Sequence, residues 1–469
     1  MPRIIVVGGG IVGLSAAMML ARDGCDVTVL ERDDCGVPGS PADAWRAWDR
    51  RGIAQFRQPH YLHAGGRHIL DERLPEVRDA LLSCDASRFD SLSMLPPFIE
   101  DRAPRPGDDR FVTLTARRPV IEYAVATCAG RTVDVRRGVA VAGLLTGPAA
   151  APGVPHVTGV RTTAGEDLPA DLVIDAMGRR SDLPRWLADL GARPLAEEAE
   201  DSGFSYYTRY FWSPSGDPPA FLTGLLTPLG SFSLLTLPGD AGTWSVTIYI
   251  SSRDQALKEV RHPDKWAAVL AACPLHAHLT DAEPVSDILA MSGIVDRYRR
   301  PVLDGTPVVT GILPVGDALA CTNPSLGRGM TMGLMHAAGT AEVVAEHLGD
   351  PVVLAAEHDR MTQDRILPWY RQTVAFDRAR KEQLDASIEG RAVRGQDGED
   401  PSGMVALQQA MLYDADVFRG FLDVISMLAL PAEIMGRPGF AERVATAPAG
   451  REPFTMPGPS RADLLALLA

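Results

Sequence analysis

Cysteine is scarce in this sequence of 469 residues, and it follows no pattern. None of the six cysteines stands in a Cys-x-x-Cys pair, which argues against a disulfide framework or a zinc site and favours a reducing compartment. No apolar run reaches the roughly 18 residues that a membrane span needs. The apolar N-terminus also lacks the basic segment of a signal peptide. We therefore expect a cytoplasmic protein without a membrane span.

Basic residues are outnumbered by acidic ones. The chain carries 46 Lys and Arg against 60 Asp and Glu, which gives a net charge of −14. Nucleic acids are bound by clustered positive charge, so we do not expect a nucleic acid partner. The hydrophobic share of 46% is that of a folded globular protein. The length is too great for one ordinary core and predicts two or more packed units.

A glycine-rich turn near the N-terminus carries the strongest signal. Gly8-x-Gly10-x-x-Gly13 lies between an expected buried strand at 3–7 and an expected helix at 11–23. Glycines at this spacing permit a tight bend, the approach of a pyrophosphate to the backbone, and close packing of helix on strand. Glu31 ends the next expected strand, where its carboxylate can accept the ribose hydroxyls of an adenosine. The pattern predicts a Rossmann-type dinucleotide site.

A second motif lies far downstream. Val315-Gly316-Asp317-Ala318 follows a strand-like run at 307–312, and the loop from Asn323 to Met330 leads into a helix expected at 329–347. An Asp at a strand end can bind the ribityl chain of a flavin, and the Pro and Gly residues of the loop let the backbone lie against a flat ring. The helix N-terminus could then stabilise negative charge on that ring. Together with the first motif, this favours FAD over NAD.

These motifs predict an α/β fold, α+β overall. A Rossmann-type FAD-binding domain would comprise residues 1–185 and 296–350, with 61–105, including a helix at about 63–83, partly contributing to the substrate side. Three β-rich runs, at 203–212, 231–236 and 243–250, predict an antiparallel sheet in an inserted substrate domain at 186–295. Residues 351–469 read as a helical C-terminal region, whose last helix begins at a capping box formed by Ser460 and Asp463 and docks on the body.

The order of the motifs resembles that of the group A-like flavoprotein monooxygenases of the p-hydroxybenzoate hydroxylase fold. The resemblance covers about residues 1–350 and rests on Gly8 to Gly13, Glu31, Arg118-x-x-Ile121-Glu122, the Asp171–Ser181 segment and Gly316-Asp317. A narrower likeness is to the branch that contains the FAD-dependent epoxidases of polyether biosynthesis. It rests on Arg51 to His60, Gly65-Gly66-Arg67 and Leu74-Pro75.

The resemblance implies roles for individual residues. Glu31 would bind the adenosine ribose, Arg118 the pyrophosphate or the flavin side of FAD, and the backbone of Val139 the adenine. Asp317 would bind the ribityl chain, while the loop from Pro324 would edge the isoalloxazine ring. The full set of cofactor-binding candidates is Gly8, Gly10, Gly13, Glu31, Arg32, Arg51, Arg118, Val139, Asp317, Pro324, Gly327, Gly329 and Met330.

One departure from the family pattern concerns the electron donor. The family's aromatic hydroxylases usually carry an Asp-Gly pair in the segment that matches Asp175 to Ser181, associated with both FAD and NAD(P)H. Here Met177 stands at the position of that Asp, and Asp175 replaces the preceding Gly. The departure puts direct reduction by NAD(P)H in doubt and leaves a separate flavin reductase as the other electron source.

No catalytic residue is assigned by the sequence. The candidates near the flavin are His60, His63, Pro324, Tyr207 and Arg209; for the two histidines a packing role is the default, and no third ligand is spaced to make them a metal site. In the strand expected at 203–212, Tyr207 and Arg209 share one face and Tyr206 belongs to the other. One face should line the substrate cavity, and the sequence leaves open which.

The resemblance implies a monooxygenase that inserts one oxygen atom from O2 through a flavin C4a-hydroperoxide. Its substrate would be an apolar or aromatic small molecule of specialised metabolism, which it would hydroxylate or epoxidise. Three alternatives stay open: an FAD-dependent reductase or dehydrogenase of the prenyl-reductase kind, a non-catalytic FAD-binding or partner-binding protein, and a flavin-dependent halogenase. The usual Trp-x-Trp-x-Ile-Pro motif of the halogenases is missing here. The substrate, the electron donor and the oligomeric state are not given by the sequence.

Overall fold

A five-stranded parallel sheet forms the centre of the first unit. The computed structural model describes residues 1–53, 55–393, 404–451 and 454–469. The strand order is β20-β9-β1-β2-β5, and every pairing is parallel. The strands are β1 (Arg3–Val7), β2 (Asp26–Glu31), β5 (Asp134–Arg137), β9 (Leu172–Asp175) and β20 (Ile312–Pro314). The outer strand β20 therefore comes from a distant part of the chain.

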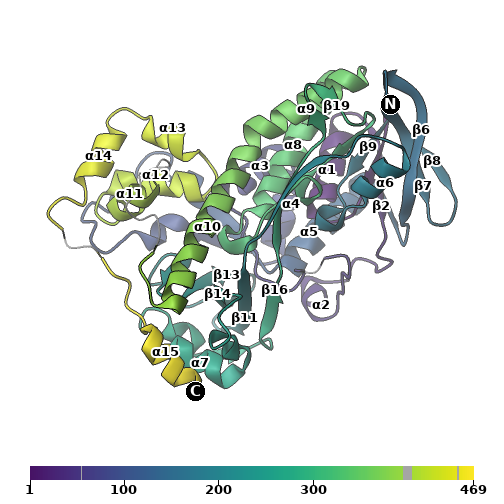
Figure 1. Ribbon diagram of the computed structural model, residues 1–469. Coiled ribbons are helices and arrows are strands. Elements are labelled where there is room, and N and C mark those ends of the chain that lie inside the picture. Colours follow the sequence, from purple (N-terminus) through teal and green to yellow (C-terminus); the bar gives the residue numbers. More distant parts are fainter. Residues whose placement is uncertain (54, 394–403, 452–453) are drawn as a thin grey trace.

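Two different layers cover this sheet (Figure 1). Ile4 and Val6 of β1 face a core shared with three helices, α1 (Ile11–Arg22), α5 (Arg118–Thr132) and α8 (Gly329–His347). Ile5 and Val7 face the other side. There the cover is a β-meander with one helix: β6 (Val141–Ala151), β7 (Val154–Thr162), β8 (Asp167–Pro169) and α6 (Leu183–Asp189). Both faces of β1 are buried, which explains its continuous apolar sequence.

The prediction of one helix at 63–83 is wrong, because the chain forms two helices there. They are α3 (Ala64–Arg73) and α4 (Pro75–Ser83), and they meet at Leu74, whose φ of −141° and ψ of 57° are not helical. Proline disfavours the helical conformation of the preceding residue and has no N–H to continue the hydrogen-bond ladder. Further helices of this unit are α2 (Pro41–Arg46) and α9 (Pro351–Arg365).

A second, antiparallel sheet lies below the first unit in Figure 1. The β-rich runs predicted from the sequence form its three longest strands, β11, β13 and β14. One face packs on α7 (Pro263–Ala271) and the other meets α10 (Leu367–Glu389). The strands are β11 (Phe204–Trp212), β12 (Leu226–Leu229), β13 (Phe232–Pro238), β14 (Thr243–Ser251), β15 (Glu283–Pro284) and β16 (Leu289–Ser292). The prediction of a mixed α/β fold is confirmed.

Small sheets connect the two larger ones. β17 pairs with both β10 and β21, so this three-stranded sheet joins segments on either side of the antiparallel one. The prediction of one strand at 307–312 is wrong in its bounds. The chain forms two short strands, β19 at the start of this range and β20 at its end. The small strands are β3 (Ser87–Asp90), β4 (Val112–Thr115), β10 (Ala196–Asp201), β17 (Val295–Arg300), β18 (Val302–Leu303), β19 (Thr306–Pro307) and β21 (Ala320–Cys321).

The C-terminal part is helical where it is described. A cluster projects from the body in Figure 1, formed by α11 (Met404–Ala410), α12 (Ala415–Ile425), α13 (Pro431–Met435) and α14 (Phe440–Thr446). The last helix, α15 (Arg461–Leu468), begins at the predicted capping box and buries Leu464 and Leu468 against α7, as expected. No helix in the described part of the chain is both long enough and apolar enough to cross a membrane.

Candidate functional site

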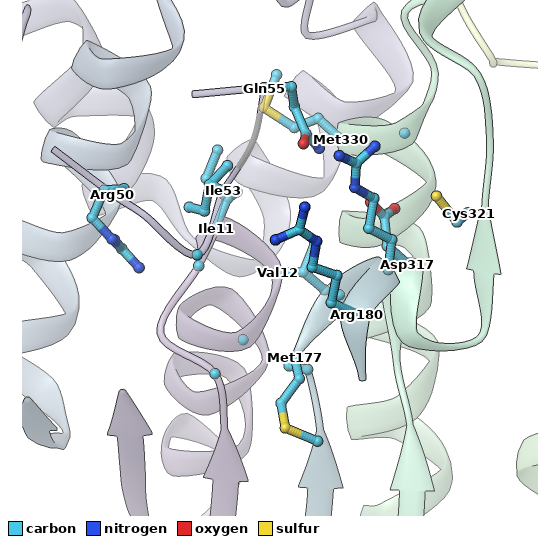
Figure 2. A pocket seen from close by; sticks show the side chains of 18 of the residues that line it. Ile11, Val12, Arg50, Ile53, Gln55, Met177, Arg180, Asp317, Cys321 and Met330 are labelled. Atoms are coloured by element: carbon cyan, nitrogen blue, oxygen red, sulfur yellow. The ribbon is translucent and has the colours of Figure 1, made fainter. Parts of the chain in front are cut away.

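A cavity of about 300 Å³ opens at the carboxyl ends of β1, β9 and β20. Ligands of open α/β sheets bind in this place. Figure 2 shows side chains converging on it from α1, from the segment after α2, and from the chain beyond β20. Of the residues predicted to bind the cofactor, all but Arg51 line this cavity.

The glycine turn at the end of β1 leaves one side of the backbone open. Gly8 has a φ of +111°, and a Cβ on Gly13 would lie 2.0 Å from the carbonyl oxygen of Gly8. Gly13 is therefore required by the packing of α1 on β1, and Gly8 by its positive φ and by the backbone of Ala176, which a Cβ would approach to 2.5 Å. Gly10 differs, because a Cβ there would meet no atom within 4 Å, and as N-cap of α1 it offers no side-chain cap. The open first turn of α1 fits an anionic phosphate group.

Glu31 lies in the cavity wall, but protein groups already use most of its carboxylate. Its Oε2 accepts from the N–H of Gly9 (2.9 Å) and from Arg50 Nη2 (2.7 Å), and its Oε1 accepts from the N–H of Asp33 (2.9 Å). A carboxylate has about four acceptor positions. One position is left for a ribose hydroxyl, where two had been expected to bind.

Arg50, not Arg51, points into the site. The Arg50 side chain is 1% exposed and forms ion pairs with Glu31, Asp33 and Glu122. The Arg51 side chain is 88% exposed and contacts only Asp49 among the described residues. The structure thus does not bring Arg51 to the cavity, because the irregular segment after α2 turns the first of the two arginines inward and the second outward.

Arg118 and His60 form a fixed pair in the wall. Arg118 Nη1 donates to His60 Nε2 (2.6 Å), so Nδ1 carries the proton and donates to the carbonyl of Gln58 (2.9 Å). Burial, with Arg118 adding to it, lowers the pKa of His60 to about 3. Arg118 also pairs with Glu122 at 3.1 Å. His60 is therefore a neutral imidazole that orients Arg118.

His63, the other histidine candidate, supports the loop rather than lining the cavity. Its Nε2–H donates to the carbonyl of Leu326 (2.9 Å), and its backbone N–H donates to Thr331. Burial lowers its pKa to about 4, and Arg328 adds to the effect. It too is neutral at physiological pH.

The turn after β20 places Asp317 in the cavity. Gly316 has a φ of +63°, and its N–H donates to His336 Nδ1 (3.0 Å), which fixes the turn. Burial raises the pKa of Asp317, with Arg118 and Arg179 opposing the shift. The carboxylate faces the open space between the glycine turn and the loop (Figure 2). This geometry fits a ligand that carries several hydroxyl groups.

The predicted ring-binding loop borders the same cavity. Pro324, Gly327, Gly329 and Met330 all line it, and Gly327 has a φ of +64°. Gly329 is the first residue of α8, so the positive end of that helix dipole faces the cavity. Val139 lines the cavity as well, but its backbone N–H already donates to the carbonyl of Glu31 (3.0 Å). That N–H is therefore not available to an adenine ring, while Arg32 borders the same end.

The structure shows which face of β11 turns toward the site. The Tyr206 hydroxyl donates to Asn323 Oδ1 (2.9 Å), and the Thr208 hydroxyl donates to Oε1 of Gln58 in the cavity wall (3.4 Å). Tyr207 lies in the opposite core, against α7, and Arg209 Nε donates to the carbonyl of Ser286. Neither lines the cavity, so the structure places both of these catalytic candidates on the face away from it.

The segment after β9 contributes residues that sequence reasoning missed. Asp175 is fully buried and accepts from Ser181 and from the N–H of Met177, and burial raises its pKa to about 6. It therefore faces inward and does not replace the missing Asp of the family pattern. Arg179 and Arg180 line the cavity instead, and Arg180 extends toward its centre in Figure 2. Their place inside the motif segment was the available signal.

Other missed residues lie toward the antiparallel sheet. Gln55 and Gln58 come from the irregular segment after α2, and Met291 and Ile294 come from β16 and the turn beyond it. Gln55 and Gln58 fall within the Arg51 to His60 segment of the narrower likeness, which implied no role for either, and no sequence motif marks Met291 or Ile294. Cys321 lies close to Asp317 in the same wall (Figure 2). Within the described residues, no group of three His, Cys, Asp or Glu side chains could hold a metal ion.

Comparisons with known proteins agree with this geometry. Residues 3–44 match the family model of FAD dependent oxidoreductases. A protein of Mycobacterium tuberculosis, Protein Rv3254, is 27% identical over 394 residues, which cover 78% of this chain and 77% of the relative.

Solved structures share the fold at low sequence identity. A flavoprotein/dehydrogenase from Cytophaga hutchinsonii gives a TM-score of 0.61 at 15% identity and covers 96% of this chain and 100% of that one. PqsL, a probable FAD-dependent monooxygenase from Pseudomonas aeruginosa, gives 0.56 at 16% identity and covers 83% and 99%. The flavin-dependent brominase Bmp2 gives 0.55 at 18% identity and covers 83% and 91%. The N-terminal segment is thus similar to that of FAD dependent oxidoreductases, and the fold of the chain is shared with these flavoproteins.

Proposed function

We propose that this chain is an FAD-dependent monooxygenase that adds one oxygen atom from O2 to an apolar small molecule. The observation that carries the proposal is the meeting of three elements in one cavity. The glycine turn at Gly10 is far in sequence from the carboxylate of Asp317 and the loop from Pro324 to Met330, yet all three border the same space.

FAD in this cavity would supply the redox and oxygen chemistry. The protein's own groups would bind and orient it. The open first turn of α1 would hold the pyrophosphate, Asp317 the ribityl hydroxyls, and the backbone from Pro324 to Gly329 the ring. The N-terminus of α8 would stabilise negative charge on the ring.

The state of the histidines supports a reaction in which the cofactor carries the chemistry. His60 and His63 are both neutral, and each is already held by protein groups. A general acid–base catalyst needs a pKa near the working pH, which neither has. Their arrangement favours positioning of Arg118 and of the loop over proton transfer to a substrate.

The character of the wall supports an apolar substrate. Met291 and Ile294 offer apolar surface toward the antiparallel sheet, while Gln55 and Gln58 provide polar groups that could orient a ligand. A substrate from specialised metabolism is supported by the sequence likeness to the polyether epoxidase branch, and the reaction on it would be a hydroxylation or an epoxidation.

Stopped-flow absorbance after mixing the anaerobically reduced protein with O2 tests the proposed function. We expect a transient species whose spectrum differs from those of oxidised and reduced flavin. Reduction would be compared for NADPH, NADH and dithionite, because Met177 replaces the family's Asp. Reduction by dithionite alone would support a separate flavin reductase as electron donor. Direct reoxidation without a transient, also in the presence of substrate, would refute oxygen insertion.

An FAD-dependent reductase or dehydrogenase is the second candidate. The similarity to the flavoprotein/dehydrogenase from Cytophaga hutchinsonii favours it, since the two chains share nearly their whole length. Such an enzyme would reduce or oxidise its substrate without consuming O2 in a fixed ratio to product. Oxygen uptake measured together with product formation separates the two candidates.

A further inference from the structure

The loop between Asn323 and Gly329 has two faces. Pro324, Gly327 and Gly329 border the cavity. The side chains of Asn323, Ser325 and Arg328 turn the other way and are 0%, 0% and 3% exposed. Polar side chains buried so completely need partners, and α10 supplies most of them.

Asp377 of α10 binds two of these side chains. Asn323 Nδ2 donates to Asp377 Oδ2 over 3.0 Å, and the Ser325 hydroxyl donates to Oδ1. Asp377 is 2% exposed. Burial raises its pKa to about 7, although the hydrogen bonds from Ser325 and Asn323 oppose the shift. A carboxylate at this depth costs stability unless it is well bonded. The two hydrogen bonds from the loop offset that cost and at the same time hold the loop against α10.

Two other elements hold Asn323 in the same position. The N–H of Asn323 donates to Asp296 of β17 (2.6 Å), and its Oδ1 accepts from Tyr206 of β11 (2.9 Å). All polar groups of its side chain are thereby engaged with protein. The loop is fixed from behind before any ligand enters the cavity.

Arg328 is a buried cation behind the same loop. Its Nη1 donates to Thr373 (3.3 Å), and its guanidinium lies 5.2 Å from the ring centroid of Trp369. Among the described residues its Nε has no hydrogen-bond partner, and Asp377 is the carboxylate whose charge acts on it. Burial lowers its pKa to about 10. Arg328 directly precedes α8, so its charge adds to the positive end of that helix.

We infer that Asp377 is a positioning residue for the flavin loop, and that the opposite charges of Asp377 and Arg328 set the balance between oxidised and reduced flavin. The inference rests on the proposed FAD site. Two-electron reduction leaves negative charge on the ring when only one proton is taken up. In a poorly solvated site, a nearby cation favours that form and a nearby anion disfavours it.

The midpoint potential of the bound flavin, titrated with dithionite against a reference dye, measures this balance without any substrate. At a pH well above 7, where Asp377 is ionised, Asp377→Asn keeps the shape and removes the anion. We expect the reduced form to gain about tenfold, which is about 30 mV for a two-electron couple. Arg328→Gln removes the cation, and we expect a shift of similar size in the opposite direction.

Two further variants separate charge from packing. Asp385→Asn removes a buried charge from the same helix, but Asp385 binds Ser251 and Lys381 instead of the loop, so the potential should stay unchanged. Ser325→Ala removes one bond to Asp377 and no charge. It should weaken FAD binding severalfold, measured by flavin fluorescence on dilution. Because the lost bond favours the ionised form of Asp377, it should also raise the potential, by less than Asp377→Asn does.

The outcomes decide the inference. Opposite shifts for Asp377→Asn and Arg328→Gln support it, while shifts of the same sign, or none beyond that of Asp385→Asn, overturn it. If Asp377→Asn does not yield folded protein, the Arg328→Gln shift decides alone, because a structural role would not lower the potential. A protein that holds FAD but forms no oxygen transient would refute the proposed monooxygenase and leave this measurement intact.

Discussion

The two ends of the cavity are built in opposite ways. At the nucleotide end, the turn from Gly8 to Gly13 and the carboxylate of Glu31 belong to one continuous strand–helix–strand run. At the ring end, the loop is held by His63, Asp296, Tyr206 and Asp377, which come from separate parts of the chain. The first end is encoded locally, and the second depends on the whole fold. Substitutions at the two ends should therefore differ in their effects on the stability of the protein and on FAD binding.

Arg50→Met should give the largest loss of stability. It would leave the carboxylates of Glu31 and Asp33, and that of Glu122, buried without their shared cation. Removing one partner of a buried ion pair costs about 3–5 kcal/mol. Urea unfolding of the apoprotein would measure it. Arg51→Met is the matched control, since that exposed neighbour should change the free energy of unfolding by less than about 0.5 kcal/mol. Equal losses would contradict the placement of both arginines.

Gly13→Ala should cost somewhat less. The added Cβ would lie 2.0 Å from a backbone oxygen of Gly8, and backbone cannot move aside as a flexible side chain can. Overpacking of this kind costs about 3 kcal/mol, and thermal unfolding of the apoprotein would show it. An unchanged melting temperature would mean that α1 does not pack on β1 as described.

His63→Gln tests the ring end through its pH dependence. The folded-state pKa of His63, about 4, lies below the ordinary 6.5, so acid protonates the unfolded chain first. Wild-type stability from this group is fully present above pH 6.5 and is lost as the pH falls toward 4. At pH 5 the loss is about 2 kcal/mol. Between pH 7 and pH 5 the free energy of unfolding, measured in urea, should therefore fall by about 2 kcal/mol less in the variant than in the wild type. Equal falls would contradict the prediction.

Gly10→Ala should have the smallest effect on the fold and a clear effect on binding. No atom lies within 4 Å of the added Cβ, so stability should change by less than about 0.5 kcal/mol. The methyl group would stand on the open side where a phosphate approaches. FAD affinity, followed by fluorescence quenching, should fall at least about tenfold. Unchanged affinity would remove the glycine turn from the proposed phosphate site.

Local patterns made the nucleotide end predictable. The glycine spacing and the apolar runs on both sides depend on neighbours a few residues away, and helix α8 follows the expected bounds from Gly329 to His347. The choice between Arg50 and Arg51 could not be made in this way. The segment that carries them is irregular, and without a period the sequence does not say which side chain turns inward.

The two faces of β11 show a second limit. Alternation predicts that Tyr206 and Tyr207 point in opposite directions, but both side chains are buried, one toward α10 and the other toward α7. Without a contrast between an apolar and a polar face, the sequence cannot say which one meets the cavity. The contact of Asp377 with the loop could not be predicted for a related reason, because its partners Asn323 and Ser325 lie more than 50 residues away in the sequence.

The position of β20 at the edge of the parallel sheet has a consequence for synthesis on the ribosome. Residues 312–314 complete that edge next to β9, and the antiparallel sheet is translated between the two strands. Until β20 emerges, the nascent chain presents β9 as an open edge, which is a template for wrong pairing. The ring end follows later still, since Asp377 of α10 is translated after the loop that it holds. A nascent chain can therefore offer FAD only the nucleotide half of its site until most of the protein has been made.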